Sequence, residues 1–339
     1  MGYTLAFIVA AAASALLTPV CRWVALRCGV LDHPVSSIKS HTAPVPYLGG
    51  IAVAGAFFLT IVLVRLTTDF PTGTLHAFRG VLFGGVLVLL VGLTDDLKYR
   101  GIHFTAKFAG EIVAVAAVMA YDIRIIFVSP EWLAVVLTMV WVVGMTNALN
   151  LIDVMDGLAA GVGAVAALSF FVIGIFNDGP VLINYAALAL AGGCIGFLPY
   201  NLSSRRRIFM GDTGALFIGL MLAVIALGSR YSTQNRFAVV APLLVLFIPL
   251  YDTVLVSVLR MLKGRSPFLG SRDHFSLRLQ AAGMHKRMVL VLSCAAGVLF
   301  GVAGFTVTQA EPAVAGAVVV LLATLVWLAT ARIVRIPVE

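Results

Sequence analysis

Apolar runs long enough to cross a lipid bilayer recur along almost the whole 339-residue sequence. A helical span needs about 20 apolar residues, because the hydrocarbon core is about 30 Å thick and a helix rises about 1.5 Å per residue. The pattern predicts an all-α polytopic transmembrane bundle with about eleven spans, forming one membrane domain over residues 1–339. The predicted spans lie near residues 2–20, 47–65, 79–96, 105–121, 132–149, 157–176, 183–199, 213–229, 237–258, 288–308 and 312–331.

The composition leaves no room for a sizeable soluble domain. Hydrophobic residues make up 61% of the sequence and charged residues 11%, whereas an ordinary soluble domain has roughly 25% charged residues. The formal net charge of +8 is therefore interpreted first as a topology signal, and no nucleic-acid partner is expected. The four cysteines are scattered without metal-binding spacing: Cys21, Cys28, Cys194 and Cys294.

Basic residues are distributed unevenly between alternate connections of these spans. Of the 23 Lys and Arg residues, only five lie in one set of loops, namely Arg65, Arg79, Arg124, Arg230 and Arg236. The positive-inside rule makes the richer set cytoplasmic. We therefore expect an inner-membrane protein with its N-terminus outside and its C-terminus in the cytoplasm, as an odd number of spans requires.

Four polar residues recur every three positions after the fifth apolar run: Asn147, Asn150, Asp153 and Asp156. On a helix this spacing forms a stripe that drifts slowly around one side. Amides and carboxylates are unfavourable in lipid, so we expect the stripe to face a functional site. A short polar loop between two helices is the alternative interpretation.

Two further acidic motifs lie on the same predicted cytoplasmic side. Asp95-Asp96 ends the third predicted span, and Gly211-Asp212 opens the eighth. Adjacent buried carboxylates repel each other unless a cation is present. Mg²⁺ is the expected cation, with Mn²⁺ as an alternative, because Mg²⁺ is held by one or two carboxylates together with substrate phosphates. The competing interpretations are a solvated helix end beside Lys98 for the pair and a helix N-cap or first-turn residue for Asp212.

Other polar residues lie in or near the predicted cytoplasmic loops. Lys39, in the first loop, is a point charge that suits a phosphate. Arg272 and His274 lie in the longest loop, where Asp273 or a metal is expected to fix the histidine tautomer. Each of these has the simpler alternative of an ordinary solvated side chain.

Asp252 is a carboxylate inside the ninth predicted span. Carboxylates at such positions are usually functional, because their burial in lipid is costly. We expect it either to pair with Arg260, two turns further along the helix, or to reach the site.

Four motifs in order resemble the polyprenyl-phosphate N-acetylhexosamine-1-phosphate transferase family. They are Lys39 with Pro44-Val45-Pro46-Tyr47-Leu48-Gly49-Gly50; Asp95-Asp96-Leu97-Lys98; Asn147-x-x-Asn150-x-x-Asp153-x-x-Asp156-Gly157-Leu158; and Phe209-Met210-Gly211-Asp212-Thr213-Gly214. Each motif is weak by itself, but their order over about residues 35–280 is specific.

The resemblance implies Mg²⁺-dependent transfer of a sugar 1-phosphate from a UDP-N-acetylhexosamine to a polyprenyl phosphate at the cytoplasmic membrane face, with release of UMP. It implies catalytic roles for Asp95, Asp96 and Asp153, and metal binding by Asp212 with Asn150. It implies substrate binding by Lys39, Asn147, Asn150, Asp156, Arg272 and His274. Because some members of the family are dimeric, a homodimer is a further expectation.

One departure from the family pattern concerns the last cytoplasmic motif. The family has a His-x-His-His cluster there, whereas this sequence has only His274. The span count and Asp252 resemble the N-acetylglucosamine branch more than the phospho-N-acetylmuramoyl-pentapeptide branch, which stays an alternative. A transporter of anionic solutes is the alternative from another class, although transporter sites usually lie near the bilayer midplane.

Overall fold

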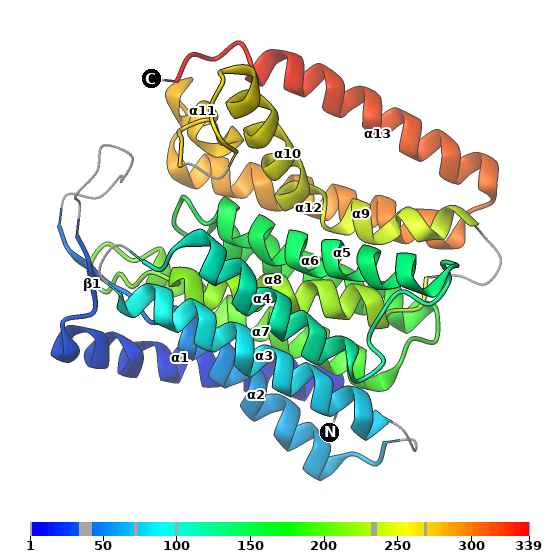
Figure 1. Cartoon of the computed structure of the whole chain (residues 1–339), viewed down its shortest axis with the longest axis horizontal. Helices are drawn as coiled ribbons and strands as arrows, with labels where there is room; N and C mark the ends of the chain where they lie inside the picture. Colours follow the sequence, from blue (N-terminus) through cyan, green and yellow to red (C-terminus); the bar gives the residue numbers. More distant parts are fainter. Residues whose placement is uncertain are drawn as a thin grey trace.

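The computed structural model describes residues 2–33, 43–70, 74–98, 101–231, 236–267 and 270–338. Lys39 lies outside these residues. The described chain is almost entirely helical, with one short antiparallel ribbon in which β1 (Leu31–Asp32) pairs with β2 (Val45–Pro46) (Figure 1). The helices are α1 Tyr3–Cys28, α2 Gly49–Thr67, α3 Thr74–Leu97, α4 Phe104–Met119, α5 Glu131–Ile152, α6 Leu158–Phe176, α7 Val181–Asn201, α8 Gly211–Gly228, the 3₁₀ helix η1 Arg236–Val240, α9 Ala241–Val245, α10 Phe247–Leu262, α11 Phe275–Ala281, α12 Lys286–Gln309 and α13 Pro312–Ile333.

The predicted membrane class is confirmed. Among the described residues, nine helices are long and apolar enough to cross a membrane, and a tenth span exists if the bent pair Phe237–Val245 and Phe247–Leu262 counts as one. The fourth predicted span corresponds to α4, whose 16 residues are fewer than the roughly 17–25 of a typical transmembrane helix. The count of eleven spans therefore stays a prediction.

The ninth predicted span is broken by a bend of 75° between α9 and α10. Pro249 lies in the first turn of α10. In one continuous helix its ring would clash with the carbonyl of Val245, and it has no N–H to donate there. Starting a new helix at Phe247 removes this conflict, because the first-turn N–H groups of a helix have no intrahelical partner anyway.

Helix α8 lies in the interior of the bundle, and 83% of its 18 residues are buried. Glycines let α2 and α3 approach its first turn. A Cβ on Gly50 would lie 2.1 Å from the Gly214 nitrogen, and a Cβ on Gly92 would lie 2.5 Å from Thr213 Cα. Small residues permit this approach of backbones in membrane proteins. The contact holds the end of α3 against the start of α8.

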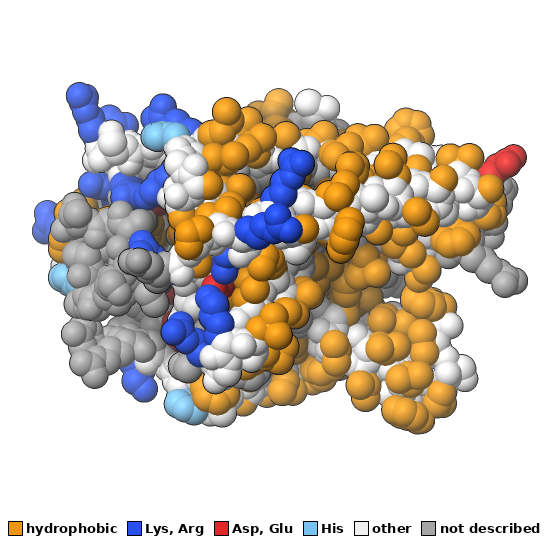
Figure 2. Space-filling view, turned by 90° about the horizontal axis from the view of Figure 1, so that it is seen from above, with side chains coloured by type: hydrophobic (Ala, Val, Ile, Leu, Met, Phe, Trp, Pro, Cys, Tyr) orange, Lys and Arg blue, Asp and Glu red, His pale blue; other side chains and the backbone are white. Residues whose placement is uncertain are grey.

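The C-terminal helices form a layer beside the α5–α6 side of the bundle (Figure 1). Helix α13 is the least enclosed of the nine candidate spans, because only 11% of the residues in its apolar 18-residue stretch are buried. The beginning of α1 and the end of α13 lie toward opposite ends of the bundle (Figure 1). Most Lys and Arg side chains visible in Figure 2 gather toward one end, while hydrophobic side chains cover most of the remaining surface.

Candidate active site

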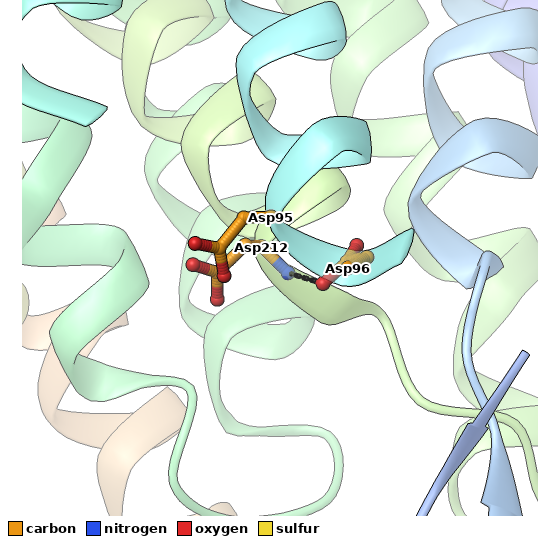
Figure 3. A group of neighbouring side chains, drawn as sticks. All are labelled: Asp95, Asp96 and Asp212. Atoms are coloured by element: carbon orange, nitrogen blue, oxygen red, sulfur yellow. Dashed lines mark hydrogen bonds between the residues drawn. The ribbon is translucent and has the colours of Figure 1, made fainter. Parts of the chain in front are cut away.

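Three aspartates from two distant segments meet where α3 ends and α8 begins. Asp95 and Asp96 belong to the last turn of α3, and Asp212 is the second residue of α8. One carboxylate oxygen from each lies within 4.8 Å of the others, a grouping able to hold a metal ion. In Figure 3 the Asp95 and Asp212 side chains lie next to each other, whereas Asp96 lies on the other side of the α8 start.

The Asp96 carboxylate caps α8 from a different helix. Its Oδ1 accepts the N–H of Asp212 at 2.9 Å (Figure 3), and its Oδ2 accepts the N–H and the hydroxyl of Thr213 at 3.0 Å and 2.5 Å. Gly211 has a φ of +72°, and a Cβ there would lie 2.4 Å from the Asp96 carboxylate. Glycine therefore makes this approach possible. Asp212 itself is a first-turn residue and not the cap.

Asp95 is held by the loop that follows α3. Its Oδ1 accepts the N–H of Ile102 at 2.9 Å. Gly101, with a φ of +72°, turns the chain beside this carboxylate. The side chain is half-buried and faces Asp212, so these two carboxylates form the open part of the cluster.

Asp212 is surrounded by donors from two other helices. Its Oδ1 accepts the amide of Asn150 at 2.8 Å, and its Oδ2 contacts the ammonium of Lys107. Lys107 also donates to Asn150 Oδ1 at 3.0 Å. Asn150 therefore reaches the cluster, as expected, and Lys107 adds a positive charge from α4.

The predicted polar stripe is helical only in its first half. Asn147 and Asn150 belong to α5, which ends at Ile152; Asp153 is the C-cap residue, and Asp156 lies in the turn that follows. The helical interpretation is therefore wrong for the two aspartates, and the loop alternative describes them. Gly157, with a φ of +79°, then caps α6, because a left-handed conformation there favours glycine.

Asn147 and Asp156, at the two ends of this segment, have different partners. The Asn147 amide donates to Glu111 Oε2 on α4. Asp156 binds Arg207 through two hydrogen bonds, one of them 3.2 Å long between Nε and Oδ1. The guanidinium of Arg207 lies 5.2 Å from the Phe209 ring centroid. Asp156 therefore holds an arginine beside the site.

A cavity of about 240 Å³ opens beside the cluster. Its lining comprises Asp32, Tyr47, Asn150, Asp153, Val154, Met155, Asp156, Asn201, Phe209, Met210, Gly211, Asp212 and Leu277. Burial, together with the negative charges of Asp212 and Asp96, raises the pKa of Asp153 to about 7. Burial and the neighbouring Asp32 raise the pKa of Tyr47 above its usual range. The cavity lining therefore combines acidic groups with the aromatic rings of Tyr47 and Phe209.

The long loop before α11 is held by buried charges. His274 is 3% exposed, and its Nδ1 lies 2.7 Å from Asp252 Oδ2, while Asp252 Oδ1 accepts the N–H of Phe275 at 2.9 Å. One alternative of each expectation is therefore wrong: Asp252 contacts His274 and not Arg260, and Asp273 is not the group that holds the histidine. Arg260 instead donates to Ser271 Oγ at 2.9 Å.

Asp273 forms its own ion pairs, with Lys263 at 2.6 Å and Arg278 at 2.8 Å. Burial opposes ionisation, but the hydrogen bonds from Lys263, Ser271 and Arg278 outweigh it and lower the pKa of Asp273. Arg272, which lies between Ser271 and Asp273 in the chain, is exposed. His274 and Arg272 do not line the 240 Å³ cavity, so any substrate contact by them requires a larger ligand or a moved loop.

Lys107 and Glu111 are site residues that we did not select from the sequence. Lys107 counted only as a basic residue of a cytoplasmic loop, and Glu111 lay within an apolar run. The available signal is their spacing: charged residues four apart on a helix are neighbours, and charged residues within a membrane span mark functional sites.

The donor set fits a hard divalent cation. All candidate ligand atoms are oxygens, as Mg²⁺ prefers. Asp96 is tied to the backbone at the start of α8 through both of its oxygens, whereas Asp95 and Asp212 face each other (Figure 3), with only side chains and one loop N–H as their partners in the described part of the chain. Asp95 and Asp212 are therefore the better placed ligands. Tetrahedral nitrogen and sulfur sites, by contrast, need histidine or cysteine, and neither residue type is part of this cluster.

Comparisons with known proteins identify the family of the chain. The family model described as glycosyl transferase family 4 matches residues 78–230. The chain is 31% identical to the probable undecaprenyl-phosphate N-acetylglucosaminyl 1-phosphate transferase of Bacillus subtilis, over 90% of this chain and 85% of that protein. It is 34% identical to the decaprenyl-phosphate N-acetylglucosaminephosphotransferase of Mycobacterium tuberculosis, over 88% and 82%. It is 29% identical to the undecaprenyl-phosphate alpha-N-acetylglucosaminyl 1-phosphate transferase of Escherichia coli, over 84% and 78%.

A helical membrane bundle with a carboxylate cluster at its helix ends is a suitable framework for chemistry on a lipid-linked phosphate. The chain belongs to the polyprenyl-phosphate N-acetylhexosamine-1-phosphate transferase family, within glycosyl transferase family 4, and is an enzyme of the glycosyl-1-phosphate transferase type.

Proposed function

We propose that the enzyme transfers N-acetylglucosamine 1-phosphate from its UDP derivative to a polyprenyl phosphate, releases UMP and so begins a cell-envelope glycan. The printed names of the relatives, which specify N-acetylglucosamine and undecaprenyl or decaprenyl phosphate, support this choice. The observation that carries the proposal is the convergence of Asp95, Asp212 and Lys107 beside a polar cavity. Alternating charges there suit two phosphorylated substrates.

We also propose that this end of the bundle is cytoplasmic and that the chain crosses the inner membrane eleven times. This count takes α9 with α10 as one broken span and α4 as a short one. The positive-inside bias supports the assignment, as do the basic residues gathered at one end in Figure 2 and the opposite positions of the two termini in Figure 1. A water-soluble nucleotide sugar and a lipid phosphate meet at such an interface.

The proposed metal is Mg²⁺, with Mn²⁺ as a substitute. Asp95 and Asp212 would hold it, with Asn150 orienting Asp212 through its 2.8 Å hydrogen bond. When bound, the ion supplies charge neutralisation at the phosphoryl oxygens. Asp96 acts indirectly: it fixes the start of α8 and with it the position of Asp212.

The reaction needs little covalent work from the protein. An oxygen of the lipid phosphate attacks the β-phosphorus of the nucleotide sugar, and the bond to the bridging oxygen breaks with UMP as the leaving group. A phosphate monoester has a second pKa of about 6, so most of it is already deprotonated at neutral pH. Positioning and charge neutralisation then carry the rate.

Two routes for the remaining proton or phosphoryl group are proposed. Asp153 faces the cavity with a pKa of about 7, which suits it to accept a residual proton from the acceptor phosphate. Alternatively, the Asp95 or Asp96 carboxylate attacks the β-phosphorus first, UMP leaves, and an oxygen of the lipid phosphate then attacks the same phosphorus and releases the carboxylate. The hydrogen bonds that occupy Asp96 favour Asp95 for this role.

The nucleotide-binding residues form the rest of the proposal. Asp156 acts through Arg207, whose guanidinium is placed beside the cavity residue Phe209. Asn147 contributes indirectly, through its hydrogen bond to Glu111. Lys39 and Arg272 contact phosphate groups of the substrates. His274 positions α11, which contributes Leu277 to the cavity.

An assay with the purified protein tests this function directly. UDP-N-acetylglucosamine, undecaprenyl phosphate and Mg²⁺ should yield UMP and a lipid-linked sugar diphosphate. Asp212→Asn should abolish turnover over a wide range of Mg²⁺ concentrations while the protein still inserts and melts normally. Turnover with the UDP-linked muramoyl pentapeptide alone would instead favour the other branch. No UMP from any UDP-N-acetylhexosamine would overturn the proposal.

A further inference from the structure

Glu111 is a buried carboxylate with an unfilled position. It lies on α4 and is 1% exposed. One oxygen, Oε2, accepts the Asn147 amide, while Oε1 has no hydrogen-bond partner among the residues that the structure describes. Burying a charge without full compensation is costly. We therefore expect this oxygen to accept a hydrogen bond in another state of the enzyme.

Lys107 lies one turn before Glu111 on the same helix, with its ammonium turned to the metal cluster. It contacts Oδ2 of Asp212 and donates to Asn150 Oδ1 at 3.0 Å. Asn150 in turn fills the other Asp212 oxygen. Both oxygens of the proposed metal ligand are therefore already occupied, one of them by a cation.

A divalent ion bound to Asp212 would repel the Lys107 ammonium, because like charges at short distance repel strongly away from bulk water. Residues four apart on a helix are neighbours, and the flexible lysine stem allows its ammonium to move between them. Glu111 is the residue four positions after Lys107 on this helix, and its carboxylate interacts electrostatically with Lys107.

We propose that Lys107 takes the place of the metal at Asp212 in the metal-free enzyme, and that Glu111 receives the displaced ammonium when the metal binds. Asn147 holds Glu111 ready, as Asn150 holds Asp212. The pair keeps the site from holding either unbalanced carboxylates or two adjacent cations. Glu111 is thus a positioning residue that helps to set metal affinity. This inference rests on the metal of the proposed function.

Metal binding without substrates tests the exchange. The full-length protein in detergent is titrated with Mn²⁺, and the free ion is measured by electron paramagnetic resonance. Lys107→Met should bind Mn²⁺ about fivefold or more tightly than the native protein, because its competitor is gone. Glu111→Gln should bind about fivefold or more weakly, because the displaced ammonium lacks a partner.

The double variant separates exchange from a general charge effect. With Lys107→Met present, Glu111→Gln should change Mn²⁺ affinity little, since no ammonium needs a new partner. An equal loss of affinity with and without Lys107 would overturn the proposal, as would unchanged affinity in Lys107→Met. Glu311→Gln, an exposed position, is the matched control. Thermal melting checks that each variant is folded.

The outcome is distinguishable from failure of the proposed function. The expected Mn²⁺ affinities without UMP formation would support the exchange and reject the reaction. No Mn²⁺ binding by the native protein and by Lys107→Met would overturn the exchange, whereas UMP formation in a chelator would show that the transferase works without this metal.

Discussion

The carboxylate of Asp96 caps the helix that carries Asp212, with 2.9 Å between Asp96 Oδ1 and the Asp212 nitrogen. The two residues are separated by more than a hundred positions in the chain, yet one orients the other. A carboxylate at a helix N-terminus also satisfies the partial positive charge there. Of the adjacent aspartates, Asp96 therefore has a structural partner and Asp95 faces the open site.

Asp96→Ala should lower stability as well as activity. It removes the acceptor for two backbone N–H groups, which typically costs about 1–2 kcal/mol for a lost cap. Asp95→Asn, the matched control, should lose activity with little change in melting temperature, because its amide oxygen still accepts the Ile102 N–H. Thermal melting in detergent and UMP release measure the two effects. Identical melting of Asp96→Ala and native protein would contradict the capping role.

Asp153 should make the protein less stable as pH rises. Its pKa is about 7 in the folded protein, compared with 3.8 for an ordinary aspartate. The folded state therefore holds more protons in this interval, and stability falls from about pH 4 to about pH 7 and is then level. Asp153→Asn removes this contribution, so its melting temperature should rise relative to native protein across that range.

Melting curves at several pH values measure this difference. Asp69→Asn, an exposed position near the end of α2, is the control variant. A constant offset between Asp153→Asn and native protein at every pH would show that the carboxyl does not titrate in this window.

Asp156 and Arg207 should behave as one unit in nucleotide binding. The carboxylate holds the guanidinium beside Phe209, so losing either partner leaves the arginine misplaced or absent. Asp156→Ala and Arg207→Ala should each raise KM for the UDP-sugar by about tenfold, and the double variant should be no worse than the poorer single one. Additive losses would instead indicate two independent nucleotide contacts. Arg205→Ala, an exposed neighbour, should change KM less.

Asp252 should hold the loop that ends in α11. Asp252→Ala removes the acceptor for the Phe275 N–H and the partner of His274, at a cost of about 2–3 kcal/mol for buried groups left unpaired. Asp252→Asn keeps an oxygen that can accept the Phe275 N–H, so its loss of stability should be about half as large. Hydrogen exchange over residues 270–281 should rise in the same order. Thr253→Ala, whose hydroxyl bonds only Pro249 O in its own helix, serves as control; equal protection in all three variants would refute the assignment.

Much of the fold could be predicted, because lipid leaves few choices. In the hydrocarbon region a helix satisfies its own backbone, so a long apolar run predicts one directly. That rule does not predict where α9 and α10 separate, since the break depends on where Pro249 falls within a turn. It also does not predict whether a run as short as α4 crosses the membrane.

The candidate site could be predicted as a set of motifs but not as a set of contacts. Charged residues gathered on one predicted side led to Asp95, Asp96 and Asp212, which the structure brings within reach of one another. The helical register of Asn147 and Asn150 was correct, whereas α5 ends before Asp153.

By itself the sequence determined the class of protein, the family and the three aspartates of the cluster, Asp95, Asp96 and Asp212, because hydropathy and motif spacing are local properties of the chain. Only the tertiary structure decided the partners: Asp96 with the start of α8, Asp252 with His274, and Lys107 between Asp212 and Asn150. Each pair joins different segments of the chain. Their distances depend on how closely helices pack, and here glycines such as Gly50 and Gly92 allow the approach.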